Sequence, residues 1–295
     1  MMDPRLKRHP LGFWQVAEIP SAEELRAYYA KRYYQQEKAN YRHSYPPEEL
    51  DWMRIKLVQK HAAVTSLIGN RSGSMLDVGC GEGFTMAFFQ QKGWTVSGMD
   101  YSDAGLLRMN PDLRSALLVG DVFHLLDEAI STGQQYDLVW LGNVLEHVTD
   151  PVSLLNSLNK LVALNGLLVV TVPNDGTRLH ELLFETAQIP ERFWIAIPDH
   201  ISYFNAQSLS ATANACGWSC VRLISDFPID WFLTHPGSNY VADRNQGPAV
   251  HRARIALDRL MGDQDPVTVN AFYESMAAIG MGRQITAYLK LNSLP

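Results

Sequence analysis

The chain is poor in cysteine, and this limits both the compartment and the chemistry that we expect for it. Its 295 residues include three cysteines, Cys80, Cys216 and Cys220. An odd number of cysteines without paired Cys-x-x-Cys spacing indicates neither a disulfide framework nor a tetrahedral zinc site. We therefore expect free thiols, a reducing cytoplasmic location and a chemistry that uses no metal ion.

The sequence also lacks long apolar runs and an excess of positive charge. No apolar run approaches the length of a membrane-spanning helix, and the mixed residues after Arg8 do not form the apolar core of a signal peptide. With 25 basic and 31 acidic residues the net charge is -6, so no overall basic field attracts nucleic acid or an anionic membrane. We expect a small-molecule substrate instead, and no pattern indicates an oligomeric state.

Apolar content is ample, and its pattern predicts an α/β fold. Hydrophobic residues make up 46% of the chain, enough for a sizeable core. Strand-like apolar runs alternate with helical patterns, which is typical of a parallel sheet with helices on both faces. The predicted strands are 74–80, 95–100, 116–121, 136–142, 167–173, 219–225 and 284–291. The helices predicted between the first five strands are 82–92, 103–109, 124–131 and 151–163, the last of them ended by Asn165-Gly166.

A glycine-rich loop follows the first predicted strand. Residues 77–83 read DVGCGEG and lead into a helical pattern. Glycines allow positive φ and let a ligand approach the backbone, and the N-terminus of the following helix favours a negatively charged group. The next strand ends in Asp100, and an acid at this position suits a ribose diol. The dinucleotide fingerprint GxGxxG would need glycine where Phe84 stands. On the loop alone, a glycine turn in another kind of α/β protein is the alternative.

The pattern DxGxGxG at 77–83, together with Asp100, resembles motif I of the class I S-adenosylmethionine-dependent methyltransferases. The resemblance implies that S-adenosylmethionine is the cofactor and that Asp77, with the loop backbone at Gly79 and Gly81, holds its methionine part. It assigns the ribose hydroxyls to Asp100. It also implies a Rossmann-like, doubly wound sheet of seven mostly parallel strands with the last strand antiparallel. A non-catalytic cofactor-binding scaffold is the alternative, and a nicotinamide oxidoreductase is disfavoured by Phe84.

Two further strand ends carry residues for this cofactor. The third predicted strand ends at Asp121 and the fourth is followed by Asn143, so both belong to the carboxyl edge that also bears the glycine loop. In the family that the chain resembles, the acid at Asp121 receives the adenine amino group, and Asn143 with neighbouring backbone completes the pocket. The other positions that the resemblance places beside the cofactor are Tyr101 and Val122.

Candidate catalytic residues follow the fourth and fifth strands. The strings NVLEHVTDP at 143–151 and PDHISYFNAQSL at 198–209 resemble methyltransferases of bacterial quinone and surface-glycan pathways. Methyl transfer to a hydroxyl requires alignment and a proton acceptor, and His147 and His200 are the candidates because histidine titrates near neutrality. Asp199 is predicted to orient His200 or to bind substrate hydroxyls. The alternative is structural: both histidines and Asp199 then only close or cap turns.

The predicted core comprises residues 46–225 and 284–295. The segment before the core and the segment inserted between its two parts are both predicted to cover it. Residues 1–45 are rich in tyrosine, and Ser21 with Glu24 forms a capping-box pattern for a helix to about residue 36. We expect a helical lid over the cofactor, with simple packing of the rings as the alternative. A second helix is predicted from Pro47 to residue 68. Residues 226–283 are too long for a structureless loop and are predicted to form a helical cap.

The cap carries a local excess of positive charge in an acidic chain. Tyr240, Arg244 and Arg252 are predicted to bind a phosphate or carboxylate on the acceptor, since arginine presents a planar fork to such groups. The alternative is a solvated basic face that is paired with nearby acids. Together, these patterns predict an S-adenosylmethionine-dependent O-methyltransferase for a small polar metabolite. A sugar or nucleotide sugar is the first expectation, and a phenol of a quinone pathway is the second.

Overall fold

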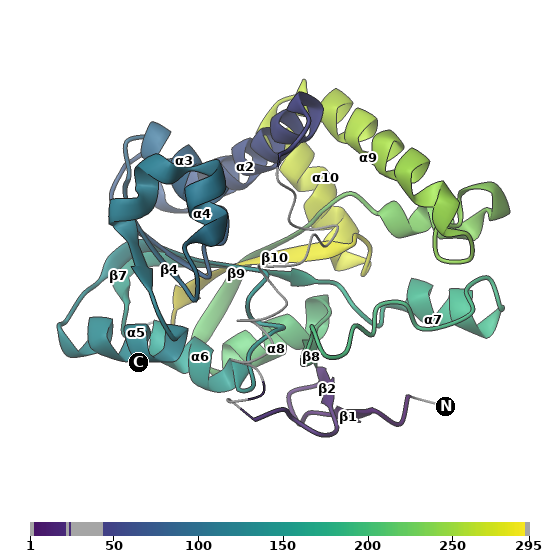
Figure 1. Cartoon of the computed structure of the whole chain (residues 1–295), viewed down its shortest axis with the longest axis horizontal. Helices are drawn as coiled ribbons and strands as arrows, with labels where there is room; N and C mark the ends of the chain where they lie inside the picture. The colour runs from purple at the N-terminus through teal and green to yellow at the C-terminus, as the bar shows by residue number, and fades with distance from the viewer. Residues whose placement is uncertain (1–2, 22–23, 25–43, 293–295) are drawn as a thin grey trace.

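A seven-stranded sheet forms the centre of the computed structural model, which describes residues 3–21, 24 and 44–292 (Figure 1). The strand order is β5-β4-β3-β6-β7-β10-β9. The bounds are β3 Ser74–Val78, β4 Thr95–Asp100, β5 Leu117–Val119, β6 Tyr136–Gly142, β7 Val162–Pro173, β9 Trp218–Ser225 and β10 Gln284–Leu291. β10 pairs antiparallel with both of its neighbours, whereas the pairings from β5 to β7 are parallel. The predicted sheet with an antiparallel last strand is therefore confirmed.

Helices cover both faces of this sheet (Figure 1). Their bounds are α2 Pro47–Ile68, α3 Phe84–Gln91, α4 Ala104–Met109, α5 Val122–Ser131, α6 Pro151–Leu158, α7 Arg178–Glu185, α8 Ala206–Ala215, α9 Gly247–Gly262 and α10 Pro266–Ala278. Successive residues of β6 point to opposite faces. Leu138 and Trp140 join the apolar cluster of α2, α3 and α10, and Val139 and Leu141 join that of α5, α6 and α8. In the part of the chain that is described, no helix is both long and apolar enough to cross a membrane.

The first described residues form a hairpin that the sequence did not reveal. β1 Leu6–Arg8 pairs with β2 Trp14–Val16, and β2 pairs with β8 Ser202–Tyr203 in a separate three-stranded sheet. Strands this short give no clear alternating pattern. The hydrogen bonds of the predicted capping box, between Ser21 and Glu24, are present. The rest of the predicted lid helix, residues 25–36, lies outside the described residues.

The predicted boundary between α6 and β7 is wrong. The sequence placed a helix over 151–163 and its end at Asn165-Gly166, but α6 ends at Leu158 and β7 already begins at Val162. Gly166 therefore lies inside β7, near an irregularity in its pairing with β6. A Cβ at this position would lie 2.9 Å from the Ala163 carbonyl oxygen and 3.0 Å from that of Asp137. The glycine marks a close approach of two backbones and not the end of a helix.

Residues 226–283, called the cap below, connect β9 to β10 and are helical as the sequence predicts. Short 3₁₀ turns, η3 Ile229–Thr234, η4 Pro236–Ser238 and η5 Arg244–Gln246, precede α9 and α10. α9 contacts α2, and α10 contacts both α2 and β9. Val269 and Tyr273 of α10 belong to the same apolar cluster as α2 and the sheet. The second half of the cap is therefore part of the cover of the sheet.

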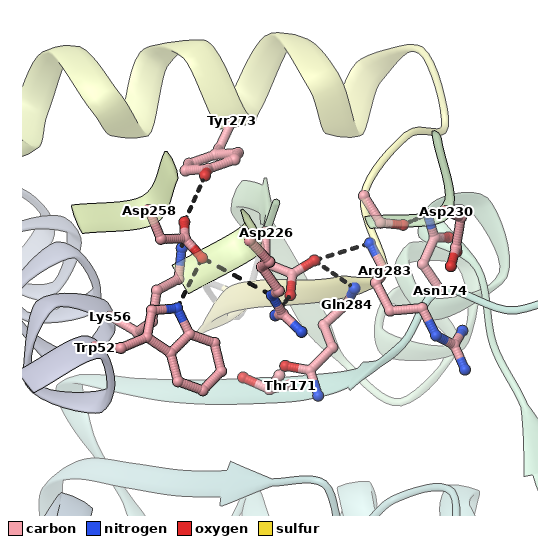
Figure 2. A network of polar contacts seen from close by, with 12 residues as sticks. Trp52, Lys56, Thr171, Asn174, Asp226, Asp230, Asp258, Tyr273, Arg283 and Gln284 are labelled. Atoms are coloured by element: carbon pink, nitrogen blue, oxygen red, sulfur yellow. Dashed lines mark hydrogen bonds and ion pairs between the residues drawn. The ribbon is translucent and has the colours of Figure 1, made fainter. Parts of the chain in front are cut away.

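One buried carboxylate joins the cap to α2 (Figure 2). Asp258 on α9 is 0% exposed. It accepts hydrogen bonds from Trp52 Nε1 at 2.8 Å, from Lys56 Nζ at 3.0 Å and from Tyr273 OH at 3.0 Å. A buried charge is tolerated where it is paired and hydrogen-bonded. Because these partners lie on α2 and α10, a single side chain holds three helices together.

Asp258→Ala is expected to lower the free energy of unfolding by about 3 to 5 kcal/mol, because Lys56 would lose its partner in a buried setting. Asp51→Ala is the matched control. Asp51 also links α2 to α9, through Arg259 at 3.3 Å, but both side chains are partly exposed, and a change below about 1 kcal/mol is expected. Urea denaturation measures both variants, and equal effects would contradict the role of the buried carboxylate.

Candidate active site

A cavity of about 680 Å³ lies at the carboxyl edge of the sheet. This edge is where open α/β sheets bind their ligands. The glycine loop after β3, the end of β4, the segment after β6 and the segment before β8 all contribute to its wall. Among the predicted residues it contains Gly79, Gly81, Asp100, Asn143, His147 and His200. Four segments that are distant in the sequence thus form one site, called the cofactor cavity below.

The glycine loop has the conformation that its sequence predicts. Gly79, Gly81 and Gly83 have φ values of 73°, 55° and 75°, which glycine adopts without strain. The N–H groups of Gly79 and Cys80 donate to the Met99 carbonyl at 2.7 and 3.2 Å and tie the loop to the end of β4. The loop therefore presents its backbone to the cavity, and α3 begins directly after it.

Two acids adjoin this loop. Asp100 lines the cavity and accepts hydrogen bonds from the Gly81 N–H at 2.8 Å and the Ser102 N–H at 3.1 Å. Asp77 is buried on the neighbouring strand, where burial and the nearby Asp100 charge raise its pKa to about 8. Asp100 thus lies in the cavity wall, whereas Asp77 is buried on β3 and is not among the wall residues. Their contacts with the ribose and the methionine part of a cofactor stay predictions.

The ends of β4, β5 and β6 hold the other predicted cofactor residues. Tyr101, Val122 and Asn143 line the cavity. Asp121 caps the N-terminus of α5, and Tyr101 OH donates to its carboxylate at 2.9 Å. Asn143 has a φ of 56°, in the left-handed region that asparagine tolerates, and its side-chain oxygen accepts from Gln284 Nε2 at 3.1 Å. Tyr101, Val122 and Asn143 therefore lie in the cavity wall, whereas Asp121 is not among its residues, and its contact with an adenine amino group stays a prediction.

The backbone brings two histidines from distant segments to one wall. The Glu146 carbonyl accepts the N–H groups of Ile201 at 2.8 Å and of Ser202 at 3.0 Å. The segment after β6 is therefore bound to the segment before β8. As a result, the rings of His147 and His200 lie with their centroids 4.9 Å apart and their planes at 84°. The sequence predicted both histidines for this edge but not their contact.

A backbone carbonyl sets the tautomer of His147. Its Nδ1 lies 2.6 Å from the carbonyl oxygen of Asp199, which can only accept a hydrogen bond. Nδ1 therefore carries the proton, and Nε2 carries the lone pair of the neutral ring. Asp199 thus orients His147 through its backbone, whereas the sequence predicted that it acts on His200 or on the substrate. Its side chain also belongs to the cavity wall.

Burial sets the charge of the neighbouring groups. It raises the pKa of Glu146, which is 1% exposed, to about 8. Burial and the adjacent His147 lower the pKa of His200 to about 3, so this ring is neutral at physiological pH. Glu146, His147 and His200 also offer one ligand atom each within 4.8 Å of one another. Nitrogen and carboxylate ligands are the kind that a zinc ion prefers, although the sequence predicted no metal.

The structure does not bring the predicted acceptor-binding residues of the cap to this cavity. Tyr240 and Arg244 line a separate cleft of about 470 Å³. Tyr240 OH donates to Asp230 at 2.6 Å, and Arg252 is exposed on α9. These three residues are therefore not gathered around the glycine loop.

Much of the positive charge of the cap is paired with acids. His251 Nε2 lies 3.4 Å from a carboxylate oxygen of Glu49, and Arg254 lies 2.7 Å from Asp226. Arg259 pairs with an acid of α2 in the same way. This is the arrangement that the sequence left open as the alternative to a phosphate site.

Glu82 and Gln284 are among the residues of the cavity wall that were missed from the sequence. Glu82 lies in the glycine loop, where burial raises its pKa, and its carboxylate accepts from Tyr45 OH at 2.9 Å. Tyr45 thus connects the segment before α2 to the loop. Position 82 between two motif glycines was a usable signal. The sequence around Gln284 carries no such signal, because the position of this residue beside Asn143 depends on how β10 enters the sheet.

The strand order, with antiparallel β10 between β7 and β9, is the one that the resemblance to class I S-adenosylmethionine-dependent methyltransferases implies, and the cofactor cavity lies at the carboxyl edge, where open α/β sheets bind their ligands. A family model described as a methyltransferase domain matches residues 43–223. The chain belongs to this family, and its methyl donor is S-adenosylmethionine.

Relatives with assigned functions match part of the chain. It is 28% identical over 148 residues to the ubiquinone biosynthesis O-methyltransferase of Aeromonas salmonicida. This match covers 50% of this chain and 58% of the relative. It is 36% identical over 107 residues to the enzyme of the same name from Salmonella arizonae, covering 34% and 44%. The chain therefore spans about half the length of these relatives.

Solved structures show the same fold. The Burkholderia thailandensis 1,6-didemethyltoxoflavin-N1-methyltransferase aligns with a TM-score of 0.53 at 13% identity and covers 99% of this chain and 98% of its own. A SAM-dependent methyltransferase from Archaeoglobus fulgidus aligns with a TM-score of 0.50 at 18% identity, covering 82% and 94%. At these identities the likeness concerns the fold alone.

Asp100→Ala is expected to weaken the binding of S-adenosylhomocysteine by about 1 to 3 kcal/mol, because a carboxylate placed for the ribose hydroxyls is lost. Asp103→Ala removes a partly exposed acid that pairs with Arg114 close by, and this control should bind normally. Isothermal titration calorimetry measures both affinities. Heat from NADH together with none from S-adenosylhomocysteine would refute the cofactor assignment.

Glu146→Gln is expected to change how stability depends on pH. The pKa of Glu146 is 4.5 as a free side chain and about 8 in the folded protein. The unfolded chain therefore loses this proton at lower pH than the folded protein does, and the free energy of unfolding falls as the pH rises from 4.5 to about 8. Below pH 4.5 the carboxyl is protonated in both states and does not change the stability. The variant should therefore exceed the native protein in unfolding free energy by about 2 to 4 kcal/mol at high pH, with little difference in acid. Urea denaturation at both ends of the window measures this, and a constant difference would contradict the raised pKa.

Proposed function

We propose that this protein transfers a methyl group from S-adenosylmethionine to a hydroxyl oxygen of a small aromatic acceptor, with His147 as the general base. One observation carries the proposal. Nε2 of His147, the nitrogen with the lone pair, belongs to a ring in the wall of the cavity that also holds Asp100 and the glycine loop. A hydroxyl in this cavity would meet the methyl donor and a proton acceptor together.

The chemistry divides between the cofactor and this wall. When bound, S-adenosylmethionine would supply a methyl group on a positively charged sulfur: the acceptor oxygen would bond to the methyl carbon in line with the carbon–sulfur bond, which would break to leave S-adenosylhomocysteine. His147 takes the hydroxyl proton at Nε2 and becomes an imidazolium ion. Glu146 Oε1, at 3.8 Å from Nε2, is the group that faces this developing charge. An imidazolium ion at this distance would favour the carboxylate form of Glu146 and so stabilise the protonated base.

His200 is assigned to positioning. A pKa of about 3 makes this ring a poor proton acceptor at neutral pH. Its ring packs edge to face against His147 and restricts how that ring can turn. We therefore expect His200 to affect the rate through the orientation of the base.

An aromatic hydroxyl is favoured over a nucleotide sugar as the acceptor. The relatives reported above are ubiquinone biosynthesis O-methyltransferases by name, which supports a ring hydroxyl. The nucleotide-sugar hypothesis depended on arginines of the cap. Arg244 lines a different cleft and Arg252 is exposed on α9, so neither offers a phosphate site in the cavity of His147.

We further propose that the segment before α2 and the cap act as covers of the site. The hydrogen bond from Tyr45 to Glu82 supports the first, because it links the end of the predicted lid, residues 1–45, to the glycine loop. The position of Gln284 supports the second, because the cap leads directly into this residue of the cavity wall.

His147→Ala is expected to lower turnover by about a hundredfold or more, with little change in S-adenosylhomocysteine affinity, because it removes the proton acceptor and no cofactor contact. His200→Ala should cause a smaller loss. His124→Ala, on an exposed face of α5, is the control. Methyl incorporation into a panel of phenols and nucleotide sugars is followed by mass spectrometry.

Two outcomes of this assay would refute the proposal. Near-normal turnover in both His147→Ala and His200→Ala would eliminate base catalysis at this wall. Methylation confined to nucleotide sugars would eliminate the aromatic acceptor.

A further inference from the structure

A second cavity, of about 240 Å³, adjoins the cofactor cavity, and both have Phe84, Thr85 and Gln284 in their walls. This second cavity, called the inner pocket below, lies between α2, α9 and α10 and the strands β9 and β10. Its wall is largely aromatic and apolar, with Trp52 and Tyr273 among its residues. Such a wall suits the flat apolar body of a small ligand.

One positive charge in the inner pocket has no ionic partner. Lys60 on α2 donates from Nζ to Thr171 Oγ1 at 3.1 Å, and Nζ lies 5.5 Å from the centre of the Trp140 ring. None of the ion pairs among the described residues includes Lys60. Charges in such an enclosed position are normally paired. An ammonium group has three donors, so Lys60 can serve a ligand in addition to Thr171.

The other charges of the inner pocket cancel one another. Lys56 pairs with Asp258 at 3.0 Å (Figure 2). Arg254 pairs with Asp226 at 2.7 Å. Asp226 also accepts the backbone N–H groups of Arg283 at 2.8 Å and Gln284 at 2.7 Å, so it is fully engaged. Burial raises the pKa values of Tyr273 and Tyr288, and both rings stay neutral. Burial lowers the pKa of Lys60 to about 8, so its ammonium form still predominates at neutral pH, and the nearby buried Asp77, whose pKa burial raises to about 8, is mostly neutral there. Within the described residues, Lys60 is therefore the one charge of the pocket that no salt bridge balances.

We propose that the inner pocket is an acceptor subsite and that it takes a monoanionic aromatic acid, with the carboxylate of the ligand paired to Lys60. A carboxylate supplies the single negative charge that the wall lacks. A phosphate group, with a charge of about -1.5 to -2, would carry more negative charge than Lys60 alone balances.

The position of Lys60 connects this subsite to the methyl-transfer site. Thr171, which binds Lys60 through Oγ1, accepts the N–H of Asn143 through its carbonyl oxygen at 2.9 Å. Asn143 lines the cofactor cavity. Because the two cavities share Phe84 and Gln284, a ring anchored at Lys60 would lie beside the cofactor cavity. The role of this subsite in methyl transfer rests on the proposed function. The binding of the acid does not, because it can be measured without any reaction.

The experiment compares two ligands of equal shape, 3,4-dihydroxybenzoate and the uncharged 3,4-dihydroxybenzamide. Their affinities are measured by calorimetry on the full chain saturated with S-adenosylhomocysteine. The native protein should bind the benzoate about tenfold or more tightly than the benzamide, because a charge-assisted pair is gained. Lys60→Met should abolish this preference. Lys92→Met removes an exposed lysine after α3 and should keep it.

A second variant keeps the test decisive if Lys60→Met does not fold. Lys60→Gln retains a hydrogen-bond donor for Thr171 without the charge, and normal binding of S-adenosylhomocysteine verifies its fold. Equal affinities of the two ligands in the native protein would overturn the inference. A preference that survives in a folded Lys60 variant would overturn it as well.

The reaction separates this inference from the proposed function. Methylation of both compounds at equal rates, without a binding preference, would leave the proposed function intact and overturn the carboxylate subsite. Preferential binding of the benzoate without any methyl transfer to it would support the subsite and contradict the proposed function for this acceptor.

Discussion

The hydrogen bonds from the N–H groups of Ile201 and Ser202 to the Glu146 carbonyl are the contacts on which the catalytic wall depends. They join the segment after β6 to the segment before β8. Without them, His147 would lose the Asp199 carbonyl that sets its tautomer and the ring that packs against it. The geometry of the wall therefore depends on where the sheet places the end of β6.

A second set of contacts leads from the cap to the same cavity. Asp226 binds Arg254 of α9 and also the backbone of Arg283 and Gln284 at the start of β10. Gln284 in turn donates to Asn143 in the cofactor cavity. The cap is thus connected to the cofactor site through one strand, and a change that loosens the cap should disturb both cavities together.

Local patterns predict much of this fold, and long-range packing decides the rest. Buried parallel strands read as continuous apolar runs, and the loop needs glycine at fixed spacing, so both are visible in the sequence. The end of α6 at Leu158 was not, because a helix end carries little signal. The positive charge of the cap suggested a phosphate site. The sequence does not show that this charge is paired, because contacts such as that of His251 with Glu49 join distant segments. Lys60 was missed because its isolation depends on how α2 packs over β7.

The most direct test is a crystal structure of the protein with S-adenosylhomocysteine and 3,4-dihydroxybenzoate bound. We expect the cofactor sulfur and a ring hydroxyl to share the cofactor cavity, with the hydroxyl within hydrogen-bond distance of His147 Nε2 and the carboxylate on Lys60 Nζ. A sulfur atom directed away from His147, or a ligand bound in the cleft of Arg244, would contradict this arrangement.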